Sequence, residues 1–434
     1  MNNNKLQPKL RFPEFVKDGE WSTDILENLS NVVRGGSPRP IEDFLTNRED
    51  GLNWLKIGDV NSESKYIVST TEKILKQAES KTRIVKPGDL ILSNSMSFGR
   101  PFILDVECGI HDGWIAISQI NKEKTNEEYL YYFISSDFAQ KYFNVYAAGA
   151  AVKNLNAEII KKLPIFYPSD KKEQQKIADC LSSLDELISL QEEKILALEE
   201  HKKGLIQNLF PQQGETVPKI RFREFKNDGD WQKKKIIDTA DKKIKWSFTG
   251  GPFGSNLKAS DYTSDGYRII QLQNIGDGEF NDTSKIYTSL EKADELISCN
   301  IYSGEIIFSK MGDPVGRTCI IPENLERSVM ASDGIRLVVD EHKFSKYFIF
   351  YLINSQPIRE KIEKKSTGST RKRIGLDELK NIEILVPKNI KEQEKIANCL
   401  SSINDSIAEE SNKILQFKTH KKGLLDGLFP KIES

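Results

Sequence analysis

The sequence predicts a mixed α/β (α+β) fold with two globular domains joined by two long antiparallel coiled-coil helices, arranged as a pseudo-two-fold tandem repeat. Two internal matches predict the repeat. Residues 8–21 (PKLRFPEFVKDGEW) and 218–231 (PKIRFREFKNDGDW) share nine of fourteen positions at an offset of 210. Residues 171–211 match residues 390–430 at an offset of 219, with 22 identities in 41 positions. Self-similarity of this extent indicates a duplication.

The middle of each half is expected to be a globular domain of strands and irregular loops. Short apolar or β-branched runs, separated by Gly, Asn and Ser clusters, predict strands at residues 90–92, 103–106, 115–120, 306–308 and 335–339. Helical segments at 128–146 and 343–364 precede closing strands at 165–167 and 384–386. The predicted division is a first globular domain at 1–170, a long helix at 171–210, a second globular domain at 211–389, and a second long helix with the C-terminus at 390–434.

The long helices carry start signals and an apolar seam. Asp170 lies three residues before Glu173, and Asn389 three before Glu392, so each pair predicts a capping box with a back-reaching glutamate. Apolar residues then recur at 4-3 spacing, which is typical of a coiled coil. Polar residues interrupt both seams at matching places: Gln191 and Lys202 in the first helix, Glu410 and Lys421 in the second. The alternative is two separate amphipathic helices, each lying on its own domain.

A helix of about 37 residues is about 55 Å long, which exceeds one turn of B-DNA at roughly 34–36 Å. An antiparallel pair of such helices is therefore expected to act as a ruler between two domains that dock on one duplex.

The middles diverge far more than the flanks. IVKPGDLIL from Ile84 corresponds to NIYSGEIIF from Asn300, each run is followed by a Gly-Arg pair, and Asp112-Gly113 corresponds to Asp333-Gly334. Constant flanks with variable middles are typical of one scaffold that presents two different recognition surfaces. Neutral drift of loops on a duplicated fold is the alternative.

Basic and amide residues in the loops of the middles are the candidate DNA contacts. Arginine to guanine and Asn or Gln to adenine are bidentate contacts that discriminate bases, whereas lysine to phosphate mainly positions the protein. For any one of these residues, a solvated loop side chain is the alternative. The candidates in the first half are Arg34, Ser37, Arg39, Lys56, Asn94, Ser95, Arg100, Lys153 and Asn154. Those in the second half are Ser255, Gln271, Gln273, Asn274, Lys310, Arg317, Arg371, Lys372 and Arg373, of which the last three end a stretch, 361–373, with six basic residues and one acid.

Composition excludes several classes of protein. The 434 residues are 38% hydrophobic and 29% charged, which suffices for packed cores and excludes wholesale disorder. The N-terminus has no signal-like apolar segment and no run approaches the ~18 apolar residues of a membrane span. Five scattered cysteines without a CxxC pair, and four histidines, indicate a reducing, cytoplasmic location and no zinc site. With a net charge of −1, a DNA-binding chain must place its basic groups locally or rely on partners.

The sequence lacks the common motifs of ATP hydrolysis, methyl transfer, nucleases, metalloproteases and serine hydrolases. It contains no Gly-x4-Gly-Lys-Ser/Thr loop, no Asn-Pro-Pro-aromatic methyltransferase motif, no Pro-Asp…Glu-x-Lys nuclease arrangement, no HExxH and no GxSxG. His201 and His420 match between the repeats but are expected to be surface or packing residues. The chain is predicted to be non-catalytic, with neither catalytic nor metal-binding residues.

The chain resembles the specificity (S) subunit of type I restriction–modification enzymes. The resemblance covers essentially the whole chain and is carried by the PK-[LI]-RF-x-EF…DG-x-W heads, the strands 88–93 and 304–309, and EQ-x-KIA-x-CLSS at the start of each long helix. The family's first recognition loop often carries Gly-Gly-Thr-Pro. Here the loops read Gly-Gly-Ser-Pro at 35–38 and Gly-Gly-Pro-Phe at 250–253.

The resemblance implies that each globular domain is a target-recognition domain reading one half of a bipartite, asymmetric site in double-stranded DNA. It implies that the helices set the gap and dock two methyltransferase (M) subunits for adenine methylation, that restriction (R) subunits join them, and that no membrane is involved. The chain itself would need no cofactor, because S-adenosylmethionine, ATP and Mg are expected on the partners. Two alternatives stay open: an S-like remnant of a fused restriction enzyme, and a non-DNA scaffold that holds two protein partners through its divergent domains.

Overall fold

The chain folds into two compact units that share the long helices. The computed structural model describes residues 6–60, 64–94, 99–147, 155–369 and 371–430. The first unit comprises Met1–Glu192 with Asn412–Ser434, and the second comprises Glu193–Ser411. Each unit therefore combines a globular part, the start of the long helix that follows it, and the end of the other long helix.

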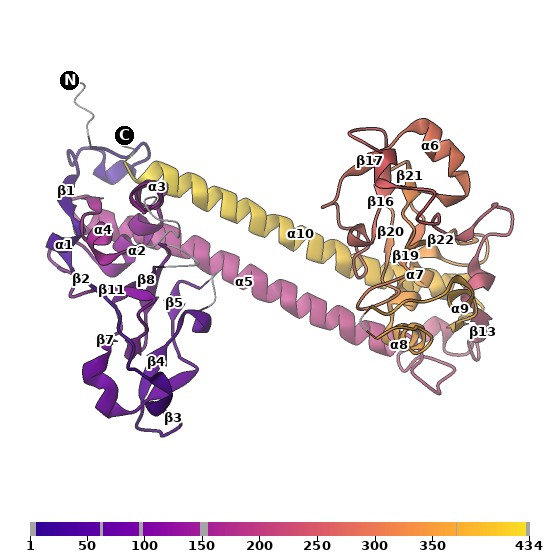
Figure 1. Cartoon of the computed structure of the whole chain (residues 1–434), viewed down its shortest axis with the longest axis horizontal. Coiled ribbons are helices and arrows are strands. Elements are labelled where there is room, and N and C mark those ends of the chain that lie inside the picture. The colour runs from indigo at the N-terminus through magenta and orange to yellow at the C-terminus, as the bar shows by residue number, and fades with distance from the viewer. Residues whose placement is uncertain (1–5, 61–63, 95–98, 148–154, 370, 431–434) are drawn as a thin grey trace. The chain divides into compact units, whose positions relative to one another are not determined.

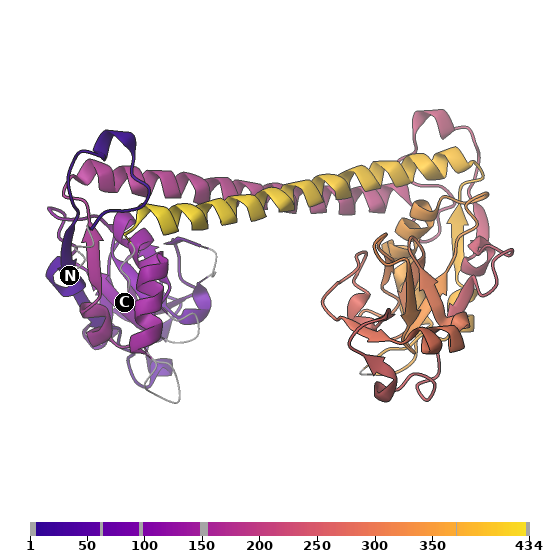
Figure 2. The same cartoon turned by 90° about the horizontal axis from the view of Figure 1, so that it is seen from above.

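The two predicted long helices are present as α5 (Lys171–Leu209) and α10 (Ile390–Leu428). In each unit one end of magenta α5 lies beside the opposite end of yellow α10 (Figures 1 and 2). In the first unit Lys421 bonds to Asp185, and Lys418 Nζ lies 3.0 Å from Glu192 Oε1. The residue numbers rise along one helix as they fall along the other, which confirms the antiparallel arrangement within this unit.

The second unit repeats this cross-helix pairing. Lys194 Nζ lies 2.6 Å from Glu410 Oε1, and Glu410 is buried. Glu410 and Lys421 are two of the polar residues that interrupt the apolar seams. Because each pairs with a charge on the opposite helix, these interruptions fix the register of the pair.

The predicted capping box at the start of α5 is only partly present. Asp170 does accept a hydrogen bond from the Lys172 backbone N–H at 2.8 Å. Glu173 does not reach back, however. Its carboxylate, 1% exposed, accepts two bonds from the Arg11 guanidinium at 2.7 and 2.8 Å and one from the Trp21 indole at 3.3 Å. A buried carboxylate is stable when a bidentate guanidinium neutralises it, so this pairing displaces the local cap.

The second unit repeats this anchor with equivalent residues. Glu392 accepts from Arg221 at 2.8 Å twice and from Trp231 at 3.2 Å. The Arg and Trp of each repeated head therefore meet the Glu that begins the following helix. This contact explains why both repeats retain the head motif and the motif at the start of the long helix, although the two motifs are far apart in sequence.

Strands of the first unit pack in layers. Strand β1 (Ser22–Ile25) pairs with β12 (Pro164–Tyr167). One sheet has the order β3 (Leu45–Thr46), β6 (Glu72–Ile74), β4 (Leu52–Leu55), β10 (Cys108–Ile110), β7 (Arg83–Val85). Another has the order β2 (Asn31–Arg34), β11 (Trp114–Ser118), β8 (Leu90–Ser93), β9 (Pro101–Leu104), β5 (Tyr66–Ile67).

The sheet containing β8 is covered on both faces. Successive side chains of a strand point to opposite faces. Accordingly Leu90 and Leu92 pack in the core that contains the helices, while Ile91 packs in the core shared with the sheet of β4 and β10. Burial on both faces explains why these strands read as continuous apolar runs rather than alternating ones.

Helices of the first unit are α1 (Leu26–Leu29), α2 (Glu127–Ser135), α3 (Asp137–Tyr146) and α4 (Ala157–Lys161). The prediction of one helix at 128–146 is wrong, because the chain breaks at Ser136, whose hydroxyl caps α3. The prediction of one helix at 343–364 is wrong for a similar reason. Helices α7 (Lys346–Asn354) and α8 (Gln356–Lys364) meet at Ser355, and a proline lies in the first turn of α8.

The second unit follows the same plan. Strand β13 (Gln232–Lys235) pairs with β23 (Glu383–Val386). One sheet has the order β14 (Phe248–Gly250), β22 (Gly334–Leu337), β19 (Ile306–Ser309), β20 (Thr318–Ile320). Another has the order β15 (Tyr262–Thr263), β17 (Ile286–Thr288), β16 (Tyr267–Ile270), β21 (Arg327–Met330), β18 (Asn300–Tyr302). Helices α6 (Leu290–Glu295) and α9 (Leu376–Lys380) complete it.

The ends of the long helices are built into the globular cores. Leu428 and Phe429, at the end of α10, pack in the core of the first unit. Leu209 and Phe210, at the end of α5, pack in that of the second. The Leu and Phe of each repeated Leu-Phe-Pro motif therefore attach the long helix to the core of the unit in which it ends.

Candidate nucleic-acid interface

In the first unit, candidate residues gather around the corner 111–113 between β10 and β11. Arg34 ends β2 and Asn94 follows β8, the two neighbours of β11. Lys56 follows β4, which runs parallel to β10, so Lys56 leaves the sheet at the same edge as the corner. Sheet topology thus brings together residues that are up to 78 positions apart.

Asp112 is the centre of this cluster. Its carboxylate accepts from Ser37 Oγ at 3.1 Å and lies 3.2 Å from Arg39 Nη2 and 3.0 Å from His111 Nε2. The Arg34 Nε donates to the Asp112 carbonyl at 2.9 Å. Burial alone would raise the pKa of Asp112, but the charge of His111, the Ser37 hydroxyl and the two guanidinium groups together lower it.

Three further candidates of the first unit have partners within the protein. Asn94 is 5% exposed and donates to the Asp112 carbonyl at 3.1 Å, so its amide supports the corner. Lys56 Nζ lies 2.6 Å from Glu72 Oε1, a contact that raises the pKa of Lys56. The Arg100 guanidinium lies 5.6 Å from the centre of the Phe102 ring.

Ser95, Lys153 and Asn154 lie outside the described residues. Their assignment as DNA contacts stays a prediction.

Glycine in the first recognition loop of each unit serves close packing. A Cβ on Gly35 would lie 2.2 Å from the His111 carbonyl oxygen, and one on Gly251 would lie 1.9 Å from that of Ala331. Both loops therefore press against the equivalent corner of their own unit. Ser255, later in the second of these loops, is exposed.

The amide candidates of the second unit are Gln273 and Asn274, in the short helical turn Leu272–Asn274, and Gln271, which directly precedes that turn. Asn274 is fully buried, donates to the carbonyls of Asn281 and Ser284 at 2.9 and 3.1 Å, and accepts from the Gln271 N–H. It holds the turn and has no exposed edge for a base. Gln273 is exposed and donates to the Gln271 side chain at 3.1 Å, so these two amides form the accessible pair.

Lys310 and Arg317 bound a loop that contacts the hairpin in which Thr367 pairs with Arg373. The Lys310 N–H donates to the Asp333 carbonyl at 2.6 Å, and the Ile374 N–H donates to the Lys310 carbonyl at 3.0 Å. Arg317 is half-buried, and its Nε has no hydrogen-bond partner among the described residues.

The basic residues at 371–373 divide into different roles. Arg371 is exposed, Lys372 bonds to Glu363, and Arg373 bonds to Asp333, the counterpart of Asp112. An Asp-Gly corner that holds an arginine is therefore present in both units. Sequence reasoning singled out the repeated Asp-Gly pair but did not assign the aspartate to the site.

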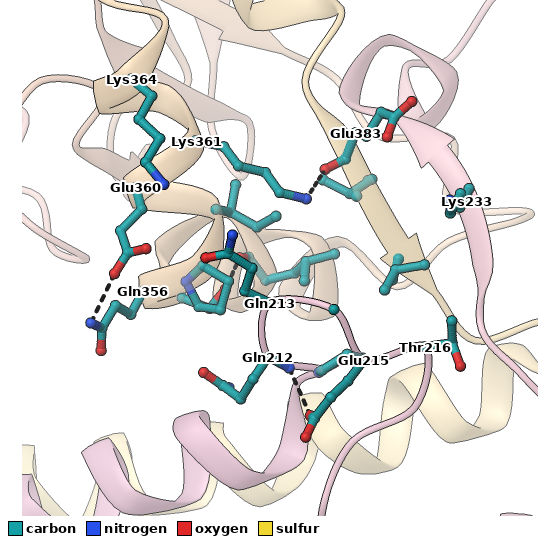
Figure 3. A pocket seen from close by; sticks show the side chains of 18 residues that line it. Gln212, Gln213, Glu215, Thr216, Lys233, Gln356, Glu360, Lys361, Lys364 and Glu383 are labelled. Carbon is teal, nitrogen blue, oxygen red and sulfur yellow. Dashed lines mark hydrogen bonds between the residues drawn. The ribbon is translucent and has the colours of Figure 1, made fainter.

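The basic residues of the stretch 361–373 differ in their surroundings. Lys361 Nζ donates to the Glu383 carbonyl at 2.9 Å, and burial lowers the pKa of Lys361. With Lys364 it lines a pocket of about 580 Å³ beside the turn that contains Gln212 and Glu215, as Figure 3 shows. The hairpin residues 371–373 do not line this pocket.

Comparison with known proteins identifies the family. The family described as type I restriction modification DNA specificity domain matches residues 19–200 and 228–417. The chain belongs to this family. The specificity domains thus occur twice, in agreement with the duplication, and each match runs into a long helix.

Relatives are similar over nearly the whole chain. The MjaVIII type I restriction enzyme specificity subunit of Methanocaldococcus jannaschii is 23% identical, covering 98% of this chain and 94% of its own. The crystal structure of a type I system S subunit from M. genitalium is 14% identical, with a TM-score of 0.56, and covers 98% of this chain and 100% of its own. A chain from a study of type I system assembly is 17% identical, with a TM-score of 0.59, and covers 94% and 96%. These structural matches confirm the fold.

Two other kinds of feature, metal sites and membrane-spanning helices, are not found in the described part of the chain. Among the described residues, no group of three His, Cys, Asp or Glu side chains is placed to hold a metal ion. Within that same part of the chain, no helix is long and apolar enough to cross a membrane.

Proposed function

We propose that the chain is the DNA-specificity subunit of a type I restriction–modification enzyme. Each unit reads one half of a bipartite, asymmetric target in double-stranded DNA, and α5 and α10 set the gap between the half-sites. The proposal depends on one observation. The two units have equivalent strands and long helices, but different loops meet at the Asp-Gly corner of each unit. The corner at Asp112 holds Arg34, Ser37 and Arg39, whereas the corner at Asp333 holds Arg373 and the backbone of Lys310.

Charge supports a division of labour with partners. The chain has a net charge of −1, and DNA affinity grows with the number of phosphates that lysine and arginine neutralise. The chain therefore supplies base discrimination, while two methyltransferase subunits contribute most of the grip on the duplex. S-adenosylmethionine would bind to these partners, and ATP and Mg to restriction subunits that join them. Family membership supports this function over a non-DNA scaffold.

The proposal is tested by shortening both helices. Removing seven residues centred on Lys194, together with seven centred on the equivalent Lys413, preserves the heptad seam. It shortens each helix by about 10 Å at 1.5 Å per residue. At 3.4 Å per base pair, the gap between half-sites is expected to contract by about three base pairs.

The readout is the set of methylated adenines in a genome modified by the reconstituted enzyme. The paired substitutions His201→Gln and His420→Gln, at equivalent exposed positions on the same helices, serve as a control and should leave the gap unchanged. Methylation at the original spacing by the shortened enzyme would refute the role of the helices.

A further inference from the structure

The Asp-Gly corner is one of few features that both divergent middles retain. Asp112 precedes β11 and Asp333 precedes β22, the equivalent strand of each unit. Retention of glycine has a packing reason, because a Cβ on Gly113 would lie 2.6 Å from the Ile57 side chain and one on Gly334 would lie 3.2 Å from Ile307. Packing of the glycine does not explain why the preceding residue is an aspartate in both units.

In the first unit, Asp112 is held firmly while its arginine projects outward. The carboxylate is 26% exposed and is fixed by Ser37 and His111, and the Ser37 hydroxyl also accepts from the Asp112 N–H at 3.3 Å. Arg39 contacts it through Nη2 only, and its side chain is 81% exposed. A fixed acid thus orients a guanidinium group whose other edge faces solvent.

In the second unit, the same acid orients an arginine from a different loop. Asp333 is 16% exposed, and Arg373 contacts it through Nη2 with half of its side chain exposed. The backbone around Arg373 is held as well. Its N–H and carbonyl exchange hydrogen bonds with Thr367 at 2.8 and 2.9 Å, and the Gly312 N–H donates to the Lys372 carbonyl at 3.1 Å.

We propose that Asp112 and Asp333 are positioning residues that orient Arg39 and Arg373 as the base-reading arginines of the two half-sites. This inference rests on the proposed function. It names the residues involved: an aspartate that both repeats share, and an arginine that comes from a different loop in each unit.

Three physical arguments favour base reading over phosphate binding or stability. A neutral Arg–Asp pair is a poor phosphate ligand, because the carboxylate repels the phosphate and the pair releases few counterions. A guanidinium held in one orientation loses less entropy when it makes the bidentate contact that discriminates guanine. The ion pairs themselves add little to stability, because the Arg39 and Arg373 side chains are 81% and 50% exposed.

The test compares base preference at each half-site. Full-length chains carrying Asp333→Asn, Asp112→Asn or Arg373→Lys are assembled with the methyltransferase, and methylated sites are mapped on a randomised DNA library. Asp333→Asn and Arg373→Lys should both relax one or two positions of the same half-site, by roughly 5- to 150-fold in discrimination. Asp112→Asn should relax the other half-site only. Asp294→Asn, which breaks a 2.6 Å pair with Arg327 in the second unit, is the matched control and should change neither half.

The outcomes separate the inference from the function on which it rests. A wild-type enzyme that methylates no bipartite site refutes the proposed function itself. If the wild-type site is bipartite, unchanged preferences in Asp333→Asn, or a uniform loss at all sites, overturn the positioning role. A change in Asp333→Asn without one in Arg373→Lys means that the acid reads a base directly, which also overturns it. Should Asp333→Asn fail to fold, Arg373→Lys decides alone, and an unaltered base preference refutes the inference.

Discussion

Breaking the buried anchor of the second unit should destabilise that unit strongly. In Arg221→Met, the Glu392 carboxylate, which is 1% exposed in the intact pair, would keep only the Trp231 indole N–H as a side-chain donor in place of three. Removing one partner of a buried pair typically costs about 3–5 kcal/mol. For a unit of this size, 1 kcal/mol corresponds to roughly 2–4 °C, so the expected fall in Tm is about 6–20 °C.

The assay is urea and thermal unfolding followed by circular dichroism, with hydrogen exchange to assign the loss to the second unit. The double variant Arg221→Met, Glu392→Leu removes both buried charges and should recover much of the lost stability. Asp294→Asn breaks an ion pair in which the acid is 57% exposed and should cost about 0–1 kcal/mol. A cost below about 1 kcal/mol for Arg221→Met, or a double variant less stable than it, would contradict the assignment.

Three further results are expected. Asn274→Asp removes two buried amide donors, so it should cost about 1–3 kcal/mol and lower methylation at all sites equally, as urea unfolding and site mapping would show. The environment of Asp112 lowers its pKa, so its ionised form adds stability above the unfolded pKa that is lost as pH falls through the folded pKa. The stability gap between wild type and Asp112→Asn should therefore be present at pH 7 and close in acid, measured by urea unfolding at each pH. Replacing Arg371, Lys372 and Arg373 with Ala should abolish target methylation without dissociating the methyltransferase, checked by size-exclusion chromatography; persistent methylation would show that the hairpin does not contact DNA.

The candidate site shows how far local sequence reasoning reaches. Loops rich in Arg, Asn and Gln could be located, because turn residues and strand ends are local signals. The sequence could not predict which of these side chains faces outward. An amide side chain that reads adenine is chemically the same as one that caps a buried turn. Asn94 and Asn274 are of the second kind, and their roles follow from carbonyl groups that the fold brings to them.

The sequence by itself determined the duplication, the two long helices and the family, because repeated words and heptad spacing are properties of the chain's order. Only the tertiary structure decided which distant residues meet. Glu173 lies 162 positions from Arg11. Its carboxylate binds the Arg11 guanidinium and does not cap the helix because it is buried, and no local sequence pattern encodes that burial. The pairing of Asp112 with Arg39 and of Asp333 with Arg373 was decided in the same way. Each carboxylate pairs with the arginine that the sheet topology brings close to it, and that arginine comes from a different loop in each unit.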